Sequence, residues 1–166
     1  MSSNVSHKIK KRNSSNDIFI TPLELAKKAI DMIEYNQADI WFDPFKNTGN
    51  YYNQYPNDNK LYSEILEGKD FFDFNEKIDI ICSNPPYSII DKVIEKSIEL
   101  KPRVINYLIG VGTLTARRLE MFENAGYGLT KIHMCKVYKW YGMSFIIQFE
   151  KNKQSIISFD RIVWKE

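Results

Sequence analysis

The sequence contains few of the residues that build disulfides or metal sites. Only two of its 166 residues are cysteines, Cys82 and Cys135, too few for a disulfide framework or a zinc site. The two histidines, His7 and His133, lie far apart, and neither has a partner at metal-ligand spacing. We therefore expect no metal centre, a reducing intracellular setting, and two cysteines that act as small buried residues.

Long hydrophobic runs are also lacking. No stretch approaches the roughly 18 apolar residues of a membrane span, and the polar N-terminus lacks the apolar core of a signal peptide. With 43% hydrophobic and 27% charged residues, the composition is that of a globular protein. Because a chain of this size buries one core, we expect a single domain over residues 17–166 and no association with a membrane.

Charge is distributed unevenly along the chain. The net charge is +2, yet residues 1–16 carry +4, residues 17–100 carry −8 and residues 101–140 carry +5. Residues 1–16 are also rich in Ser, Asn and Lys and almost free of apolar side chains, which predicts a disordered basic arm. The arm and the later basic segment suit contacts with phosphates, although solvated charges on an ordinary surface would give the same pattern.

The hydrophobic pattern alternates between the periods of strands and helices. Helices are expected from Thr21-Pro22 to Tyr35-Asn36, with Thr21 as the cap, and over residues 89–100 and 113–124, the last ending at Gly126. Strands are expected over residues 38–42, 61–65, 69–72, 78–83, 104–109, 129–137, 144–149 and 156–163. This order predicts an α/β fold, with a mainly parallel sheet, an antiparallel C-terminal hairpin and helices on both faces.

An unusual corner, Asn84-Pro85-Pro86-Tyr87, follows the most apolar of these strands. Two prolines lack backbone N–H groups and enforce extended geometry, so the strand ends abruptly at the sheet edge where ligands of α/β proteins bind. The Asn84 amide oxygen and the Pro85 carbonyl can accept both hydrogens of a planar amine, while Tyr87 stacks on the attached ring. The alternative is a plain Pro-Pro turn whose tyrosine packs on the following helix.

Placed between a strand and a helix, Asn-Pro-Pro-Tyr resembles the catalytic motif of S-adenosylmethionine-dependent amino-methyltransferases, above all the N6-adenine DNA methyltransferases. The motif order and short chain are most similar to adenine-methylase-like proteins of large DNA viruses. The resemblance covers residues 18 to about 150 and implies a Rossmann-like class I methyltransferase fold that needs no metal. It also implies four catalytic residues: Asn84, Pro85, Pro86 and Tyr87.

Three further segments resemble cofactor-binding motifs of this family: Asp43-Pro44-Phe45-Lys46-Asn47-Thr48-Gly49, Ile20-Thr21-Pro22-Leu23-Glu24 and Gly68-Lys69-Asp70-Phe71-Phe72. The family's loop reads Asp-Pro-Phe-x-Gly-x-Gly, and an acidic residue after the second strand binds the ribose. The resemblance thus assigns S-adenosylmethionine to Thr21, Pro22, Asp43, Pro44, Phe45, Asn47, Gly49, Glu64, Asp70 and Phe71. The alternatives are a simple Asp-Pro turn, a solvated Glu64, and core positions for Phe71 and Phe72.

Two departures from the family pattern affect this half of the site. Asn47 replaces the first glycine of the loop, and Asn is the residue that best tolerates a positive φ in place of glycine. Only five residues separate Glu64 from Asp70, too few for the helix that normally joins the two strands. We therefore expect a compressed cofactor-binding edge.

The chain has no room for a separate DNA-recognition domain, so basic residues of the domain itself or a partner subunit must contact the nucleic acid. The candidates are Arg117, Arg118, Lys136 and Lys139. An ordinary exposed helical face is the simpler explanation of the two arginines. The cluster Tyr138-Lys139-Trp140-Tyr141-Gly142 suits stacking on bases or burial of a sheet edge, and His133 suits the core or an interface.

These observations predict an enzyme that transfers a methyl group from S-adenosylmethionine to the N6 amine of adenine in DNA. One alternative keeps the chemistry and changes the acceptor to adenine in RNA or to a glutamine side chain of a protein. Another is a methyltransferase-like subunit without activity, which binds nucleic acid or a catalytic partner. Cofactor binding separates the last alternative from the others.

Overall fold

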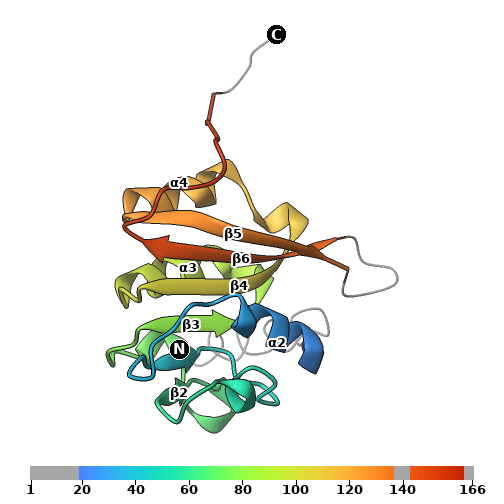
Figure 1. Cartoon of the computed structure of the whole chain (residues 1–166), viewed down its shortest axis with the longest axis vertical. Coiled ribbons are helices and arrows are strands. Elements are labelled where there is room, and N and C mark those ends of the chain that lie inside the picture. Colours follow the sequence, from blue (N-terminus) through green and yellow to red (C-terminus); the bar gives the residue numbers. More distant parts are fainter. Residues whose placement is uncertain (1–18, 137–142, 163–166) are drawn as a thin grey trace, which may run out of the picture.

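The structure, a computed structural model, describes residues 19–136 and 143–162. Its centre is a six-stranded sheet with the strand order β2-β1-β3-β4-β6-β5 (Figure 1). The first four of these strands are parallel neighbours, whereas β6 runs antiparallel to β4 and to β5. The strands are β1 (Trp41–Asp43), β2 (Lys60–Tyr62), β3 (Ile80–Ser83), β4 (Val104–Gly110), β5 (Tyr127–Cys135) and β6 (Ser144–Lys151). The predicted parallel sheet with an antiparallel C-terminal hairpin is confirmed.

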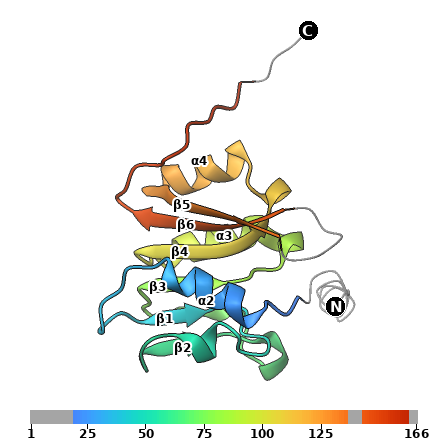
Figure 2. The same cartoon turned by 45° about the vertical axis from the view of Figure 1, so that its right-hand side comes forward.

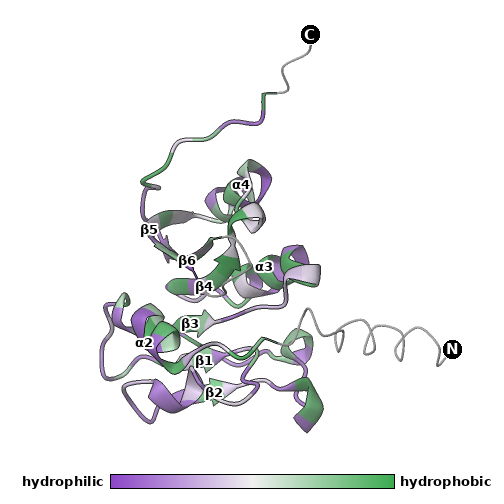
Figure 3. Cartoon of the chain, turned by 90° about the vertical axis from the view of Figure 1, so that its right-hand side faces the viewer, coloured by the Kyte–Doolittle hydropathy of each residue, from purple (hydrophilic) through white to green (hydrophobic). Residues whose placement is uncertain are grey.

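Helices cover both faces of the sheet, as predicted. α2 (Leu23–Asp31) lies on one face, whereas α3 (Ile90–Glu99) and α4 (Ala116–Asn124) lie on the other (Figure 3). Figure 2 shows α2 in front of the sheet and α3 behind it. Within residues 19–136 and 143–162, no helix is long and apolar enough to cross a membrane.

The central strand β4 packs against both helical layers. Val104 and Leu108 belong to the cluster beneath α2, whereas Ile105, Tyr107 and Ile109 belong to the larger cluster beneath α3 and α4. Successive side chains of a strand point to opposite faces, so a strand with helices on both sides is apolar at almost every position. This packing fixes the end of β4 at the same rim as the ends of β1 and β3.

Two predicted strands are wrong. Residues 69–72 form no strand, because Gly68 turns the chain with φ 75° and residues Phe71–Asp73 form a 3-10 turn in which the Asp70 side chain caps the Phe72 amide. The sheet therefore ends at β2 on this side. Residues 156–162 also form no strand, since they cross over the edge of β5 with a single backbone bond, from the Ile156 amide to the Leu129 carbonyl.

The predicted helix boundaries also need correction. Thr21 does not cap α2: Pro22 occupies the cap position, and no side chain bonds to the free amides. α2 ends at Asp31 rather than at residues 35–36, because the Asn36 amide bonds to the Asp39 carboxylate in a turn that leads into β1. The helix expected from residue 113 begins three residues later, at Ala116, with Thr115 as its cap.

The remaining sequence predictions concern a helix end, the two cysteines and three segments or residues. Gly126 follows α4 with φ 84°, so its predicted role at the helix end is confirmed. Cys82 is fully buried, whereas Cys135 is only partly buried. The arm at residues 1–16, Lys139 and the aromatic cluster at residues 138–142 lie outside the described residues.

After β6 the chain folds back over the first half of β5. The Ser155 hydroxyl accepts a hydrogen bond from the Leu129 amide at 3.0 Å, and the Ile156 amide donates to the Leu129 carbonyl at 2.9 Å. Gly128 lies directly beneath this crossing: a Cβ there would lie 2.3 Å from the carbonyl oxygen of Lys153. The crossing covers backbone groups that an edge strand would otherwise leave open.

We predict that Gly128→Ala lowers the free energy of unfolding by about 2–3 kcal/mol, because its methyl group would meet rigid backbone rather than a flexible side chain. Urea unfolding followed by circular dichroism measures the change. Gly112→Ala is the matched control, since nothing lies within 4 Å of a Cβ there. Equal stabilities of the two variants would contradict the close crossing at Gly128.

Candidate active site

The candidate site lies where β1 and β3 end side by side. Phe42 pairs with Ile81 in the parallel register, so the last residues of the two strands, Asp43 and Ser83, emerge together. The Ser83 hydroxyl donates a hydrogen bond to Asp43 Oδ1 at 2.6 Å, and neither residue has exposed surface. The loop assigned to the cofactor and the corner assigned to catalysis are therefore adjacent.

Asn84 has one amide atom paired and the other unpaired. Its Nδ2 donates a hydrogen bond to Thr21 Oγ1 at 3.2 Å. Its Oδ1 is buried and has no hydrogen-bond partner within the described part of the chain. An unpaired buried acceptor costs about 1–3 kcal/mol, and native proteins contain few of them. An unpaired acceptor at the carboxyl edge of a strand is a natural position for an N–H group of a ligand.

The rest of the corner holds an aromatic ring at the rim. Pro85 is buried, and Pro86 begins the 3-10 turn Tyr87–Ile89 that leads into α3. The Tyr87 side chain is 40% exposed, and its hydroxyl donates to the Leu108 carbonyl at 3.4 Å. The structure thus brings the four predicted catalytic residues together, and their catalytic role stays a prediction.

The loop after β1 turns through two residues with positive φ. Asn47 has φ 47° and Gly49 has φ 85°. The Gly49 amide donates to the Lys46 carbonyl at 2.7 Å, and a Cβ on Gly49 would approach the Asn53 amide nitrogen to 2.8 Å. Position 49 therefore requires glycine, and the positive φ predicted for Asn47 is confirmed.

Asp43 is a fully buried carboxyl group at the start of this loop. Burial raises its pKa to about 7. Hydrogen bonds from Ser83 and from the amides of Phe45 and Tyr52 lower the pKa and offset only part of this effect. Pro44, the next residue, is also buried. A carboxylate held this far from water is stabilised by any cation that reaches the loop.

The protonation of Asp43 makes the stability of the protein depend on pH. Its pKa is about 7 in the folded state against an ordinary value of 3.8, so between these values the folded state holds a proton that the unfolded state lacks. The stability that this proton contributes is complete below about pH 4 and is lost as the pH rises through 7. We predict that Asp43→Asn gains roughly 2–4 kcal/mol relative to the wild type between pH 4 and pH 8.

Urea unfolding of both proteins across this pH range measures the effect of Asp43. The readout is how the difference in free energy of unfolding between Asp43→Asn and the wild type changes with pH. A contribution from altered hydrogen bonding that is the same at every pH does not affect this change. A difference that stays flat from pH 4 to pH 8 would contradict a raised pKa at Asp43.

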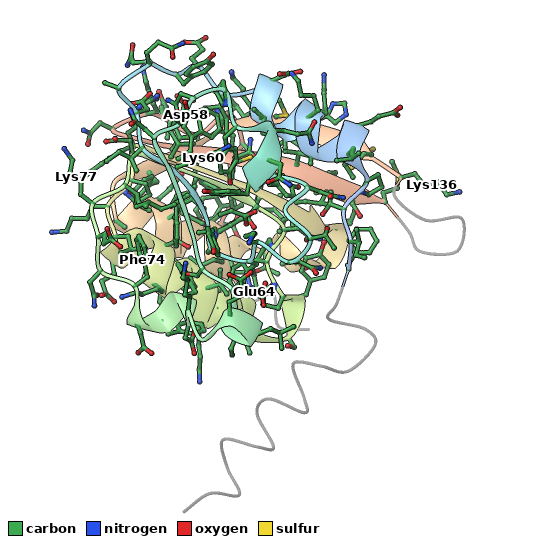
Figure 4. All side chains as sticks on the ribbon, turned by 90° about the horizontal axis from the view of Figure 1, so that it is seen from below. Asp58, Lys60, Glu64, Phe74, Lys77 and Lys136 are labelled. Atoms are coloured by element: carbon green, nitrogen blue, oxygen red, sulfur yellow. The ribbon has the colours of Figure 1, made fainter. Side chains whose placement is uncertain are left out.

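Glu64 lies beside the loop, but its carboxylate is already engaged (Figure 4). Oε2 accepts a hydrogen bond from the Asn47 amide at 2.8 Å, and Oε1 accepts one from the Leu66 amide at 3.0 Å. The carboxylate therefore links the loop to the turn that follows β2. Its assignment to the ribose of the cofactor stays a prediction that relies on the remaining lone pairs.

Asp70 and Phe71 lie on the turn that replaces the expected strand. Asp70 Oδ1 accepts a hydrogen bond from the Phe72 amide at 3.0 Å. Phe71 is only 2% exposed and packs edge-on against Phe45, with ring centroids 5.2 Å apart. Phe71 is thus a core residue, and Phe45 connects it to the loop after β1.

Sequence reasoning missed three residues of the segment between β1 and β2. Asn50 Nδ2 donates to the Thr21 carbonyl at 2.7 Å, and the Tyr55 hydroxyl donates to the Cys82 carbonyl at 2.6 Å. Tyr51 is 4% exposed, and burial raises its pKa well above 10. The high Asn and Tyr content of this segment was the one sequence feature that could have drawn attention to these residues. It did not indicate which groups they bond to.

The two arginines proposed for nucleic acid bind an acidic residue of the neighbouring helix. Arg117 and Arg118 each form an ion pair with Asp91, with N···O distances of 2.6 and 2.7 Å, and Arg118 also donates to the Thr113 carbonyl. Lys136 is exposed at the end of β5 (Figure 4). His133 is partly buried on β5.

No protein-family model and no curated protein sequence matches the chain. Its structure is similar to that of Mtq2-Trm112 from E. cuniculi, a complex responsible for methylation of the termination factor eRF1 (TM-score 0.63, 18% identity, 81% of this chain, 99% of that one). It is also similar to magnesium protoporphyrin IX methyltransferase (ChlM) from Synechocystis PCC 6803 with bound SAM (0.60, 10%, 90% and 92%). The chain has the class I methyltransferase fold.

A third similar structure is a modification subunit assigned to a type I restriction enzyme of Vibrio vulnificus YJ016. The TM-score is 0.58 at 12% identity, and the match covers 92% of this chain but 48% of that one. These neighbours act on different kinds of molecule, so the likeness establishes the fold predicted from the sequence and leaves the acceptor to be argued from the site.

Proposed function

We propose that the protein transfers a methyl group from S-adenosylmethionine to the exocyclic N6 amine of adenine in DNA. The observation that carries this proposal is the buried, unpaired Oδ1 of Asn84 beside the accessible Tyr87 ring. An N–H acceptor and an aromatic platform in one corner suit a planar amine on a ring. The fold of the chain is one that supports this class of chemistry.

The residues after β1 fit the cofactor. The loop turns tightly at Asn47 and Gly49, directly after the strand, and the buried Asp43 carboxyl at its start favours a cation. Thr21 and Pro22 lie across from this loop, tied to it by the Asn50 side chain. We assign the methionine end of the cofactor to this region, and the adenosine end to the region of Glu64, Asp70 and Phe71.

The bound cofactor supplies a methyl group on a sulfonium: the sulfur keeps the electron pair of the broken C–S bond, and the methylated nitrogen releases a proton to water. Asn84 Oδ1 and the Pro85 carbonyl accept the two amine hydrogens, which localises the nitrogen lone pair and directs it to the methyl carbon. Tyr87 stacks on the base and offsets about 1–3 kcal/mol of the cost of unstacking it. Positioning of this kind lowers the barrier by several kcal/mol.

We predict that Asn84→Ala lowers kcat by about 100-fold or more while the Kd of S-adenosylmethionine changes less than about twofold. The reason is that Asn84 holds the acceptor and not the cofactor. Methylation of DNA with radiolabelled cofactor gives kcat, and calorimetry gives the Kd. Asn124→Ala is the matched control, because Asn124 is exposed at the end of α4.

Two results would contradict this assignment in different ways. An Asn84→Ala enzyme that works at the wild-type rate would remove the proposed role of Asn84. A wild-type protein that gives no heat with millimolar S-adenosylmethionine would favour the inactive binding subunit over an enzyme.

A protein acceptor is the second candidate. Asn84 would accept hydrogens from the carboxamide of a glutamine as readily as from adenine, and Mtq2-Trm112 is among the similar structures. DNA remains the first choice because Lys136 is exposed where β5 ends, at the site end of the sheet. Parallel assays on DNA, RNA and a glutamine-containing peptide decide between the acceptors.

If DNA is the acceptor, lysines at the two ends of the sheet should contribute unequally to its binding. Lys136 follows β5 at the rim of the site, whereas Lys77 precedes β3 at the opposite end (Figure 4). We predict that Lys136→Ala weakens DNA binding about threefold at low salt and lowers the salt slope by about 1, while Lys77→Ala changes neither. Fluorescence anisotropy over a salt series measures both, and equal effects would argue against DNA at this rim.

A further inference from the structure

We propose that Thr21 is a positioning residue for the transfer: its hydroxyl holds the Asn84 carboxamide so that the oxygen, and not the NH₂ group, faces the acceptor amine. This inference rests on the proposed function and adds a role at the same corner. It starts from the different hydrogen bonding of the two amide atoms of Asn84. Nδ2 donates to Thr21 Oγ1, whereas Oδ1 is buried and unpaired.

The orientation of this amide decides whether the corner attracts or repels an amine. A carboxamide presents an acceptor at one end and two donors at the other, and a half-turn about its last bond exchanges them. With the NH₂ group toward the amine, two donors would face each other and the lone pair of the nitrogen would not be localised. A residue that holds the amide in the productive orientation therefore controls the reaction without touching the substrate.

Thr21 is fixed well enough to impose this orientation. It is 4% exposed, and the Asn50 side chain donates to its carbonyl at 2.7 Å. Gln54 in turn donates to the carbonyls of Asn50 and Leu23, at 2.6 and 3.0 Å. The segment before α2 is thus held by side chains of the segment after β1, although no side chain caps the helix.

The Thr21 hydroxyl is directed as an acceptor toward Asn84. It receives a hydrogen bond from Asn84 Nδ2, since an NH₂ group has hydrogens to donate and no lone pair to offer. Thr48, in the loop after β1, donates to Asn50 Oδ1 at 3.2 Å, so hydrogen bonds run from that loop to the catalytic corner.

The test compares Thr21→Val in two backgrounds, the wild type and Asn84→Asp. In the second background the side chain at position 84 has no amide orientation to lose. Thr21→Val keeps the shape of threonine and removes the hydroxyl, so we expect kcat, measured at saturating S-adenosylmethionine because Thr21 also belongs to the assigned cofactor region, to fall about tenfold. Thr21→Ser should restore kcat to within about twofold. In an Asn84→Asp background both oxygens are acceptors, so there the same Thr21→Val change should cost less than about twofold.

A second readout does not depend on activity. The side-chain amide signals of Asn84 are identified as those missing from the ¹⁵N–¹H spectrum of Asn84→Asp. In Thr21→Val the exchange of these amide hydrogens with water should become at least about tenfold faster. In Thr21→Ser the exchange rate should stay unchanged. Unfolding midpoints show that the variants are folded. The inference is overturned by an equal Thr21→Val loss in both backgrounds, or by amide signals that do not respond.

These outcomes differ from failure of the proposed function. A wild-type protein that methylates none of the acceptors would overturn the function, and with it any catalytic meaning of Thr21. The amide signals would still show whether Thr21 holds Asn84. A wild-type enzyme that is active, with Thr21→Val equally active, would overturn the positioning role alone.

Discussion

The site depends on one buried hydrogen bond between neighbouring parallel strands. The Ser83 hydroxyl and Asp43 Oδ1 join the last residues of β3 and β1, 2.6 Å apart, with no exposed surface on either residue. Apart from Thr21 and Pro22, the residues assigned to the cofactor begin at Asp43, and the four residues assigned to catalysis follow Ser83. Because parallel strands end at the same edge, this one contact sets the distance between the two halves of the proposed reaction.

The elements that the sequence predicts best are those with a local cause. The strand over residues 78–83 and the helix over 89–100 appear as β3 and α3 because an apolar run and two prolines define them without help from the rest of the chain. The positive φ of Asn47 also has a local cause. The contacts of Thr21 with Asn50 and Asn84 span 29 and 63 residues, so no local pattern announces them.

The sheet edge beyond β1 shows where local reasoning fails. Residues 69–72 are apolar enough for a strand, but the turn at Gly68 and the caps formed by Glu64 and Asp70 organise them as 3-10 turns instead. The same compression leads Glu64 to bond the Asn47 amide, which helps to hold a non-glycine residue at positive φ. The two departures from the family pattern, Asn47 and the short connection, are thus linked by one carboxylate.

The charge pattern changes meaning once partners are known. Residues 101–140 carry a net +5, yet Arg117 and Arg118 are both paired with Asp91, which lies outside that range. Their ion pairs tie α4 to α3 and reduce the positive field that the sequence alone indicates. Among described basic residues at the site end of the sheet, Lys136 keeps an exposed charge. If DNA is the acceptor, this scarcity of basic surface among the described residues of the rim means that the extruded base supplies most of the affinity, through Asn84 and Tyr87.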